Sequence, residues 1–272
     1  MPPGNQSAPV TGGSFLAQAH WLSIFLLAVA FVLVLAKLFF PMVSGWPEAL
    51  LVSLATISTV GAMARQLPLQ NVLLAAVGIT LIGGAAHAIG AMSGMPFGSF
   101  TFSSTAGQKL FKILPWPVPL VWVIIVLNSR GVSRLILRPW RKTRTYGFWV
   151  IGLTAVLTAL FDLALDPFAS RVKHYWFWMP ARFPVTWQGA PLVNFVGWAF
   201  VTLLILAFIT PALIKKQPGH RSPPDFHPFA VWLGAILLFS IASALHGLWI
   251  AAAVDGIIVA VTAVFAIRGA RW

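Results

Sequence analysis

The stretch WLSIFLLAVAFVLVLAKLF, residues 21–39, contains a single charge, Lys37. A helix needs ~20 apolar residues to cross the hydrocarbon core of a bilayer, so this stretch has the length and composition of a membrane span. The rest of the chain has the same character, since 59% of its 272 residues are hydrophobic and only 8% are charged. A soluble domain carries about 25% charged residues. The composition therefore excludes a soluble globular protein and predicts an integral membrane protein.

Seven further apolar runs predict an all-α polytopic helix bundle of about eight transmembrane helices, within a single transmembrane domain covering residues 1–272. The predicted spans are 21–39, 46–64, 72–92, 118–128, 148–165, 192–214, 229–245 and 249–267. The fourth is short, and His246 and Gly247 leave little chain for a turn between the last two. Residues 1–20 contain no Lys or Arg and so lack the basic region of a signal peptide, which indicates a retained first span.

The positive charges are distributed unevenly between the two sides of the predicted bundle. Of the 18 Lys and Arg residues, 12 fall on the side that holds both termini, and six of these lie in residues 129–147. Cytoplasmic loops carry the excess of Lys and Arg. We therefore expect a multi-pass protein of the inner (cytoplasmic) membrane with both termini in the cytoplasm. The net charge of +13 is assigned to topology and lipid headgroups, and no nucleic-acid partner is expected.

The residue inventory excludes several kinds of chemistry. The chain has no cysteine, which removes disulfides, thiolate catalysis and cysteine-based metal sites. Its six histidines are scattered without an HxxxH or HExxH motif, so no metal site is predicted. No phosphate loop, dinucleotide fingerprint or nucleophile elbow occurs either.

Two loops on the side opposite the termini are long and rich in aromatic residues. Residues 93–117 include GMPFGSFTFSSTAGQKLFKILPWP, and residues 167–191 read PFASRVKHYWFWMPARFPVTWQGAP. Long aromatic loops of membrane proteins often fold back over the bundle, which predicts that these two pack together on one side. The alternative is an interfacial belt, where Trp and Tyr collect without a binding role.

Asp162 and Asp166 are the sharpest candidates for chemistry, because an ionisable residue inside a span is costly. Four residues apart, they share one face of the predicted fifth helix. Two carboxylates this close in a poorly solvated site resist ionising together, so we expect one to keep its proton and to serve as a proton donor. The alternative is a structural pair at a helix end, bonded to Lys173, Arg171 or loop amides.

Three further polar positions lie in or beside spans. His87 is in the third span, and its alternative role is a buried histidine that bonds a neighbouring helix. Asn194 opens the sixth span near Trp198, where the two could orient a ligand or anchor the helix. Asp255 could pair with His246 or stand on a polar internal face.

Five strings together resemble the carotenoid hydratase family of bacterial and archaeal membrane proteins, often labelled carotenoid biosynthesis proteins. The strings are HAIGAMSGMPFGSFTF (87–102), LPWPVPLVW (114–122), FDLALDPFA (161–169), YWFW (175–178) and GAPLVNFVGW (189–198). They occur in the family's order and cover roughly residues 84–200. The outer spans add only hydropathy to the resemblance. One departure is His87, which stands where the family pattern usually places Glu.

The resemblance implies cofactor-free hydration of a terminal carbon–carbon double bond in an acyclic or monocyclic carotenoid, giving a tertiary alcohol. It also implies contact with membrane lipids and with other enzymes of carotenoid biosynthesis. The residue inventory suits such a reaction, which needs a carboxylic acid to protonate the alkene and aromatic faces to tolerate the cation. The predicted catalytic residues are Asp162, Asp166 and His87. The predicted substrate-binding residues are Pro96, Phe97, Gly98, Phe100, Phe102, Trp122, Trp176, Trp178, Asn194 and Trp198.

Two other functions stay open at this point. The chain could bind a carotenoid or related isoprenoid without transforming it, which the same aromatic loops and His87 in place of an acid would suit. It could also be a small-solute transporter, because intramembrane acids and small-residue helices fit that class. The sequence shows no inverted repeat and no paired broken helices, which transporters of this size often have.

Overall fold

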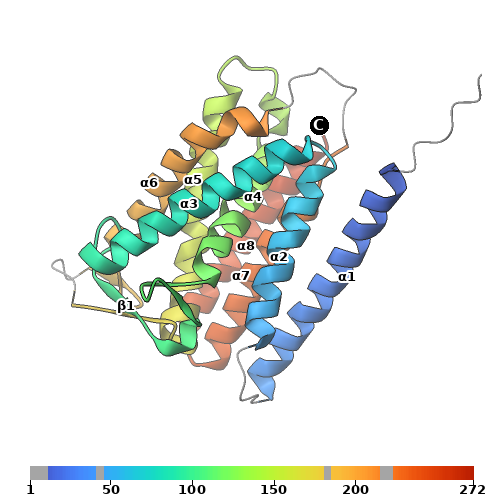
Figure 1. The fold of residues 1–272 in the computed structure, drawn as a ribbon. Coiled ribbons are helices and arrows are strands. Elements are labelled where there is room, and N and C mark those ends of the chain that lie inside the picture. The colour runs from blue at the N-terminus through green and yellow to red at the C-terminus, as the bar shows by residue number, and fades with distance from the viewer. Residues whose placement is uncertain (1–11, 41–45, 181–184, 215–222) are drawn as a thin grey trace, which may run out of the picture.

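The computed structural model describes residues 12–40, 46–180, 185–214 and 223–272, with side chains from residue 18 onward. This part of the chain contains eight helices long and apolar enough to cross a membrane (Figure 1). They are α1 (Gly12–Phe39), α2 (Trp46–Ala64), α3 (Leu69–Ser93), α4 (Pro117–Ile136), α5 (Tyr146–Pro167), α6 (Leu192–Ile209), α7 (His227–Leu245) and α8 (Trp249–Ala270). The chain is therefore a multi-pass membrane protein, and the predicted all-α polytopic bundle is confirmed.

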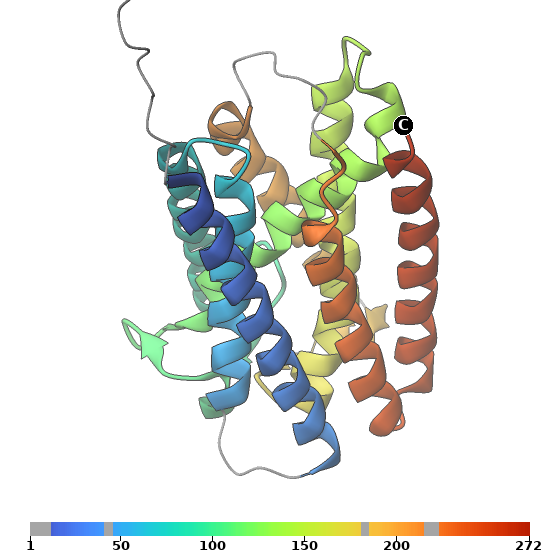
Figure 2. The same cartoon turned by 90° about the vertical axis from the view of Figure 1, so that its right-hand side faces the viewer.

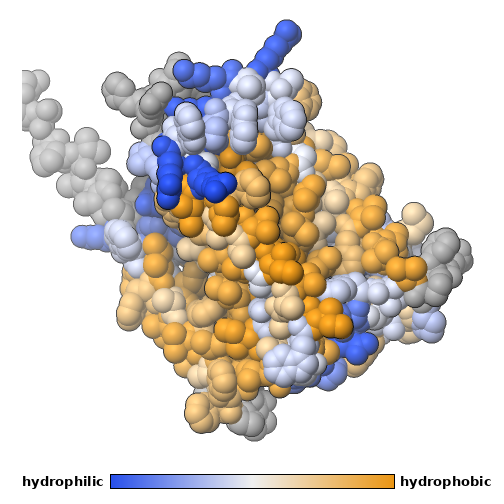
Figure 3. Space-filling view, turned by 180° about the vertical axis from the view of Figure 1, so that it is seen from behind, coloured by the Kyte–Doolittle hydropathy of each residue, from blue (hydrophilic) through white to orange (hydrophobic). Residues whose placement is uncertain are grey.

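The helices run up and down, so that the start of α1 and the end of α8 lie on the same side (Figures 1 and 2). The connections between α3 and α4 and between α5 and α6 lie on the opposite side. Figure 3 shows apolar residues covering the middle of one face, with hydrophilic residues toward the two ends. This distribution suits an apolar belt between two wet surfaces.

Helix α4 is the centre of the bundle. Within the 18-residue apolar stretch of α4, 72% of the residues are buried, whereas the figure for the corresponding stretch of α1 is 17%. The predicted end of this span at residue 128 is wrong, because the helix continues to Ile136. Arg130 lies inside the helix, where its Nη2 donates a hydrogen bond to the carbonyl of Leu213 at 3.0 Å. A buried arginine with such a partner does not end a span, although its charge lowers the hydropathy from which the end was predicted.

The two aromatic loops meet through a short antiparallel pairing of strands. Strand β1 (Phe100–Phe102) pairs with β4 (Trp176–Trp178), with Phe100 opposite Trp178 and Phe102 opposite Trp176. The other two pairings join β2 (Lys109–Leu110) to β3 (Leu114–Pro115) and β5 (Thr186–Trp187) to β6 (Ala190–Pro191). The expectation that both loops pack on one side of the bundle is confirmed.

Candidate active site

Asp162 and Asp166 lie on α5 near its loop-side end, and both are fully buried. Asn194, in the first turn of α6, donates from Nδ2 to Oδ2 of Asp162 at 2.5 Å. The other oxygen of Asp162, Oδ1, has no hydrogen-bond partner among the described residues. One carboxyl oxygen of Asp162 is therefore held in place while the other is open to a ligand or to water.

Asp166 is surrounded by donors instead. The indole N–H of Trp176 donates to its Oδ1 at 2.8 Å, and that of Trp178 approaches Oδ1 at 3.0 Å and Oδ2 at 3.2 Å. Residues two apart on a strand point to the same side, so the β1–β4 pairing presents both tryptophans to one carboxyl group. The aromatic loop is thus fastened to α5 through Asp166.

His87 of α3 faces the interior of the bundle. Trp122 on α4 donates its indole N–H to Nδ1 of His87 at 3.0 Å. A neutral imidazole has one donor and one acceptor nitrogen, so an accepting Nδ1 places the hydrogen on Nε2. The ring lies 4.4 Å from that of Phe97 and 5.2 Å from that of Trp198, measured between centroids. His87 therefore presents an N–H donor within an aromatic cage.

Glycines make room for the aromatic rings around His87. A Cβ on Gly83 would lie 2.3 Å from the ring of Trp122, and one on Gly90 would lie 2.8 Å from the ring of Phe97. Trp122 is fully buried and stacks on Trp198 with centroids 4.1 Å apart. These close approaches fix the position of Trp122 behind His87.

A small cavity lies between the acids and the aromatic cage. Its volume is about 10 Å³, close to the smallest space that holds one water molecule. Its lining residues come from both loops and from α3, α5 and α6: His87, Phe100, Phe102, Asp162, Trp176, Trp178, Asn194 and Trp198. Carboxyl, amide and imidazole groups thus meet aromatic faces around space for a single water.

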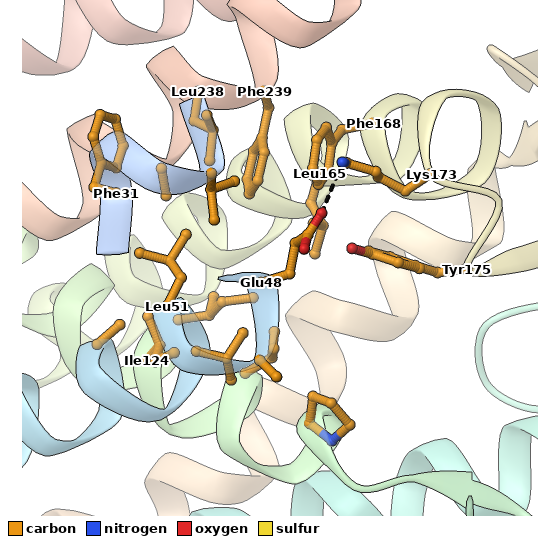
Figure 4. Close-up of a pocket in the computed structure, with 18 of the residues that line it drawn as sticks. Phe31, Glu48, Leu51, Ile124, Leu165, Phe168, Lys173, Tyr175, Leu238 and Phe239 are labelled. Carbon is orange, nitrogen blue, oxygen red and sulfur yellow. Dashed lines mark hydrogen bonds and ion pairs between the residues drawn. The ribbon is translucent and has the colours of Figure 1, made fainter. Parts of the chain in front are cut away.

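A large apolar cavity of about 1060 Å³ adjoins the small one and is bounded mainly by α1, α2, α4, α5 and α7 (Figure 4). This volume is at the upper end of the range for ligand sites. His87, Trp176 and Trp198 line both cavities. These three side chains therefore lie between the large apolar cavity and the one-water cavity beside Asp162.

An ion cluster on the wall of the large cavity was not predicted from the sequence. Glu48 of α2 accepts from Nζ of Lys37 at 2.9 Å and from Nζ of Lys173 at 2.8 Å. Figure 4 shows the Tyr175 hydroxyl directed toward Glu48, and burial together with the Glu48 charge raises the pKa of Tyr175. The signal available in the sequence was that Glu48 is one of only five acidic residues.

The predicted site residues fall into two groups. Six of the ten predicted substrate-binding residues line the small cavity: Phe100, Phe102, Trp176, Trp178, Asn194 and Trp198. The other four, Pro96, Phe97, Gly98 and Trp122, line neither cavity. Phe97 and Trp122 pack against His87, and a Cβ on Gly98 would lie 2.7 Å from Pro191. Phe97 and Trp122 therefore support the site from behind His87.

Asp255 lies apart from this site. It is fully buried on α8, and neither carboxyl oxygen has a hydrogen-bond partner among the described residues. The predicted alternative of a pair with His246 is therefore not formed, and Nδ1 of His246 lies 2.9 Å from the carbonyl of Ala242 instead. Within the described ranges, no group of three His, Cys, Asp or Glu residues could hold a metal ion.

Fold and site together define a multi-pass membrane protein with buried acids beside an apolar cavity. The sequence pattern of the family described as "Carotenoid biosynthesis protein" matches residues 47–262, most of the chain, and the chain belongs to this family. It is 30% identical over 125 residues to the bisanhydrobacterioruberin hydratase of Haloarcula japonica, a match that covers 46% of this chain and 40% of that protein. No solved structure matches the chain.

Proposed function

We propose that this protein is a carotenoid hydratase, which adds water across a terminal double bond of an acyclic carotenoid end to give a tertiary alcohol. One observation carries the proposal: Asp162, whose Oδ1 has no hydrogen-bond partner among the described residues, lines a one-water cavity that shares His87, Trp176 and Trp198 with a large apolar cavity. The apolar cavity would hold the polyene chain, and its end would pass these three side chains to reach the acid. The hydratase match in Haloarcula japonica supports the same reaction class.

Hydrogen bonding assigns different roles to the two carboxyl groups. Asp166 accepts three contacts from two indole donors, which stabilise a carboxylate. Among the described residues, Asp162 has one donor, Asn194, and an oxygen without any donor, which suits a neutral carboxylic acid. A second charge one helical turn away also disfavours ionising both. Asp162 is therefore the proposed proton donor.

In the proposed reaction, Asp162 transfers its proton to the less substituted carbon of the terminal double bond. The π electrons form the new C–H bond, so the more substituted carbon becomes a tertiary cation and Asp162 becomes a carboxylate. Water in the small cavity attacks the cation through its oxygen, and the Asp162 carboxylate then accepts the surplus proton. One alkene and one water give one alcohol, and Asp162 returns to its acid form.

The aromatic cage would stabilise the cation. Trp176, Trp178 and Trp198 line the cavity in which the positive charge forms. Tryptophan faces attract cations by ~2 kcal/mol or more where water is excluded. The cavity also admits only about one water molecule, which limits side reactions of the cation.

Pigment extraction from a host that makes an acyclic carotenoid tests this proposal. Expression of the protein should convert the pigment into its terminal tertiary alcohol, seen as a gain of one water in the mass spectrum. Unchanged pigment that copurifies with the protein would contradict the hydratase and favour a non-catalytic carotenoid-binding protein. If neither the alcohol nor bound pigment is found, both the hydratase and the carotenoid-binding protein are excluded.

A further inference from the structure

We propose that α1 is the wall that selects what enters the large cavity from the bilayer, and that Phe31 facing Gly234 is its width filter. The filter admits a slender acyclic polyene end and excludes an end that carries a ring. The proposal rests on the proposed function for the chemical class of the ligand, a long apolar polyene. It adds a specificity determinant outside the small cavity that Asp162 lines.

Helix α1 is held to the bundle by polar or ring contacts at its two ends. At one end the His20 ring lies 5.2 Å from that of His227 on α7, measured between centroids. At the other end Lys37 forms its ion pair with Glu48 of α2. Along its length α1 packs on α2 and touches α7 only slightly, as the side view in Figure 2 shows. Few contacts therefore close the boundary of the large cavity between α1 and α7.

Between those two ends, one face of α1 lines the large cavity. The lining side chains follow helical spacing and are all apolar: Ile24, Leu27, Ala28, Phe31, Val32 and Val34. From Ile24 to Val34 this face is about 15 Å long at 1.5 Å per residue. Between His227 and Leu238, the cavity-lining residues of α7 are Ala230, Val231, Gly234 and Ala235, three of which are small. A large side chain on α1 thus meets a mostly small-residue surface.

Phe31 is that large side chain. Its Cε2 atom lies 3.8 Å from the point where a Cβ on Gly234 would be. The ring therefore spans the space between α1 and α7, and any side chain at position 234 would touch it. Figure 4 shows Phe31 along the same edge of the cavity as Leu238 and Phe239. The width of the cavity at this level depends on Phe31 and on the absence of a side chain at Gly234.

The rest of the cavity belongs to the part of the chain that the family pattern matches. That match begins at residue 47, so it includes the contributions of α2, α4, α5 and α7 but not α1. The proposed acid and its aromatic cage also lie within it. Selection by α1 can therefore vary without any change at the proposed acid.

The test compares Phe31→Ala with Phe25→Ala. Phe25 is a matched control because it lies on the same helix, is 63% exposed and does not line the cavity. Each purified variant is offered an equal mixture of acyclic and ring-ended carotenoid. The amount of each pigment that the protein retains is then measured, and the ring-ended share is the ratio of ring-ended to acyclic pigment. F31A should raise the ring-ended share about tenfold, the scale on which an apolar pocket discriminates by size. F25A should match the wild type, and adding Gly234→Phe to F31A should restore the wild-type share.

Equal shares in the wild type, F31A and F25A would overturn the proposal, as would an absence of retained pigment in all of them. Retention and conversion are scored separately. If pigment is retained with the expected ratios but no alcohol forms, the hydratase proposal fails and the filter stands. If alcohol forms with unchanged ratios, the filter alone fails.

Discussion

At the scale of single residues, hydrogen bonds distinguish two carboxyl groups that lie one helical turn apart. Asp166 accepts from Trp176 and Trp178, and an amide oxygen would accept the same bonds. We therefore expect Asp166→Asn to keep the aromatic loop in place and to lose less activity than Asp162→Asn. The measurement is the alcohol-to-alkene ratio per folded protein in membranes. A larger loss in the D166N variant would reverse the proposed roles.

The second residue-scale prediction concerns His87, at a position where the resemblance to the hydratases leads us to expect Glu. His87→Glu should preserve or raise hydration, while His87→Ala should lower it. Trp122→Phe keeps the ring but removes the donor to Nδ1, so the His87 tautomer is no longer fixed and hydration should fall about tenfold. Thermal unfolding serves as the control for folding. Identical product from wild type, H87E and H87A would make His87 a packing residue only.

The sequence predicted some of these residues and not others, for a physical reason. Asp162, Asp166 and His87 are conspicuous because they are ionisable groups within apolar runs. The role of Trp122 depends on a contact between residues 35 positions apart, and Phe31 meets Gly234 across some two hundred residues. Contacts of this kind arise from helix packing, which hydropathy does not encode.

At the scale of helices, the close approach of α3 and α4 depends on Gly83. An added Cβ there would lie 2.3 Å from the Trp122 ring, which is fully buried and cannot move away freely. Gly83→Ala should therefore destabilise the protein by about 1–3 kcal/mol, the usual cost of overpacking. The matched control is Gly152→Ala on α5, where nothing lies within 4 Å. Equal thermal stability of the two variants in detergent would contradict this packing.

Helices were easier to predict than the structure between them. All eight spans follow from runs of apolar residues, and the two largest errors were the start of α1, which begins at Gly12, and the end of α4, where Arg130 bonds the carbonyl of Leu213. The aromatic loops were expected to pack together because both are long and lie on one side. Their strand register, with Phe102 opposite Trp176, could not be predicted from two aromatic-rich segments without a repeating pattern.

At the scale of the whole molecule, the charge distribution predicts orientation in the membrane. The connection between α4 and α5 lies on the side of the termini (Figure 1), and it carries Arg138, Arg141, Lys142 and Arg144. We expect this side to be cytoplasmic. A fluorescent protein fused after Trp272 should fold and emit, and alkaline phosphatase fused after Lys112 should be active. Phosphatase activity at the C-terminal fusion would contradict this orientation.

The central claim is that the protein adds water to a carotenoid end and that Asp162 supplies the proton. Membranes containing wild-type or Asp162→Asn protein are given an acyclic carotenoid in water labelled with ¹⁸O, and the products are weighed by mass spectrometry. The wild type should yield a tertiary alcohol that carries one ¹⁸O atom. The D162N variant should yield at least about a hundredfold less, the scale of general acid catalysis, while retaining as much pigment. Labelled alcohol at the wild-type level from D162N, or alcohol whose oxygen comes from O₂, would contradict the account.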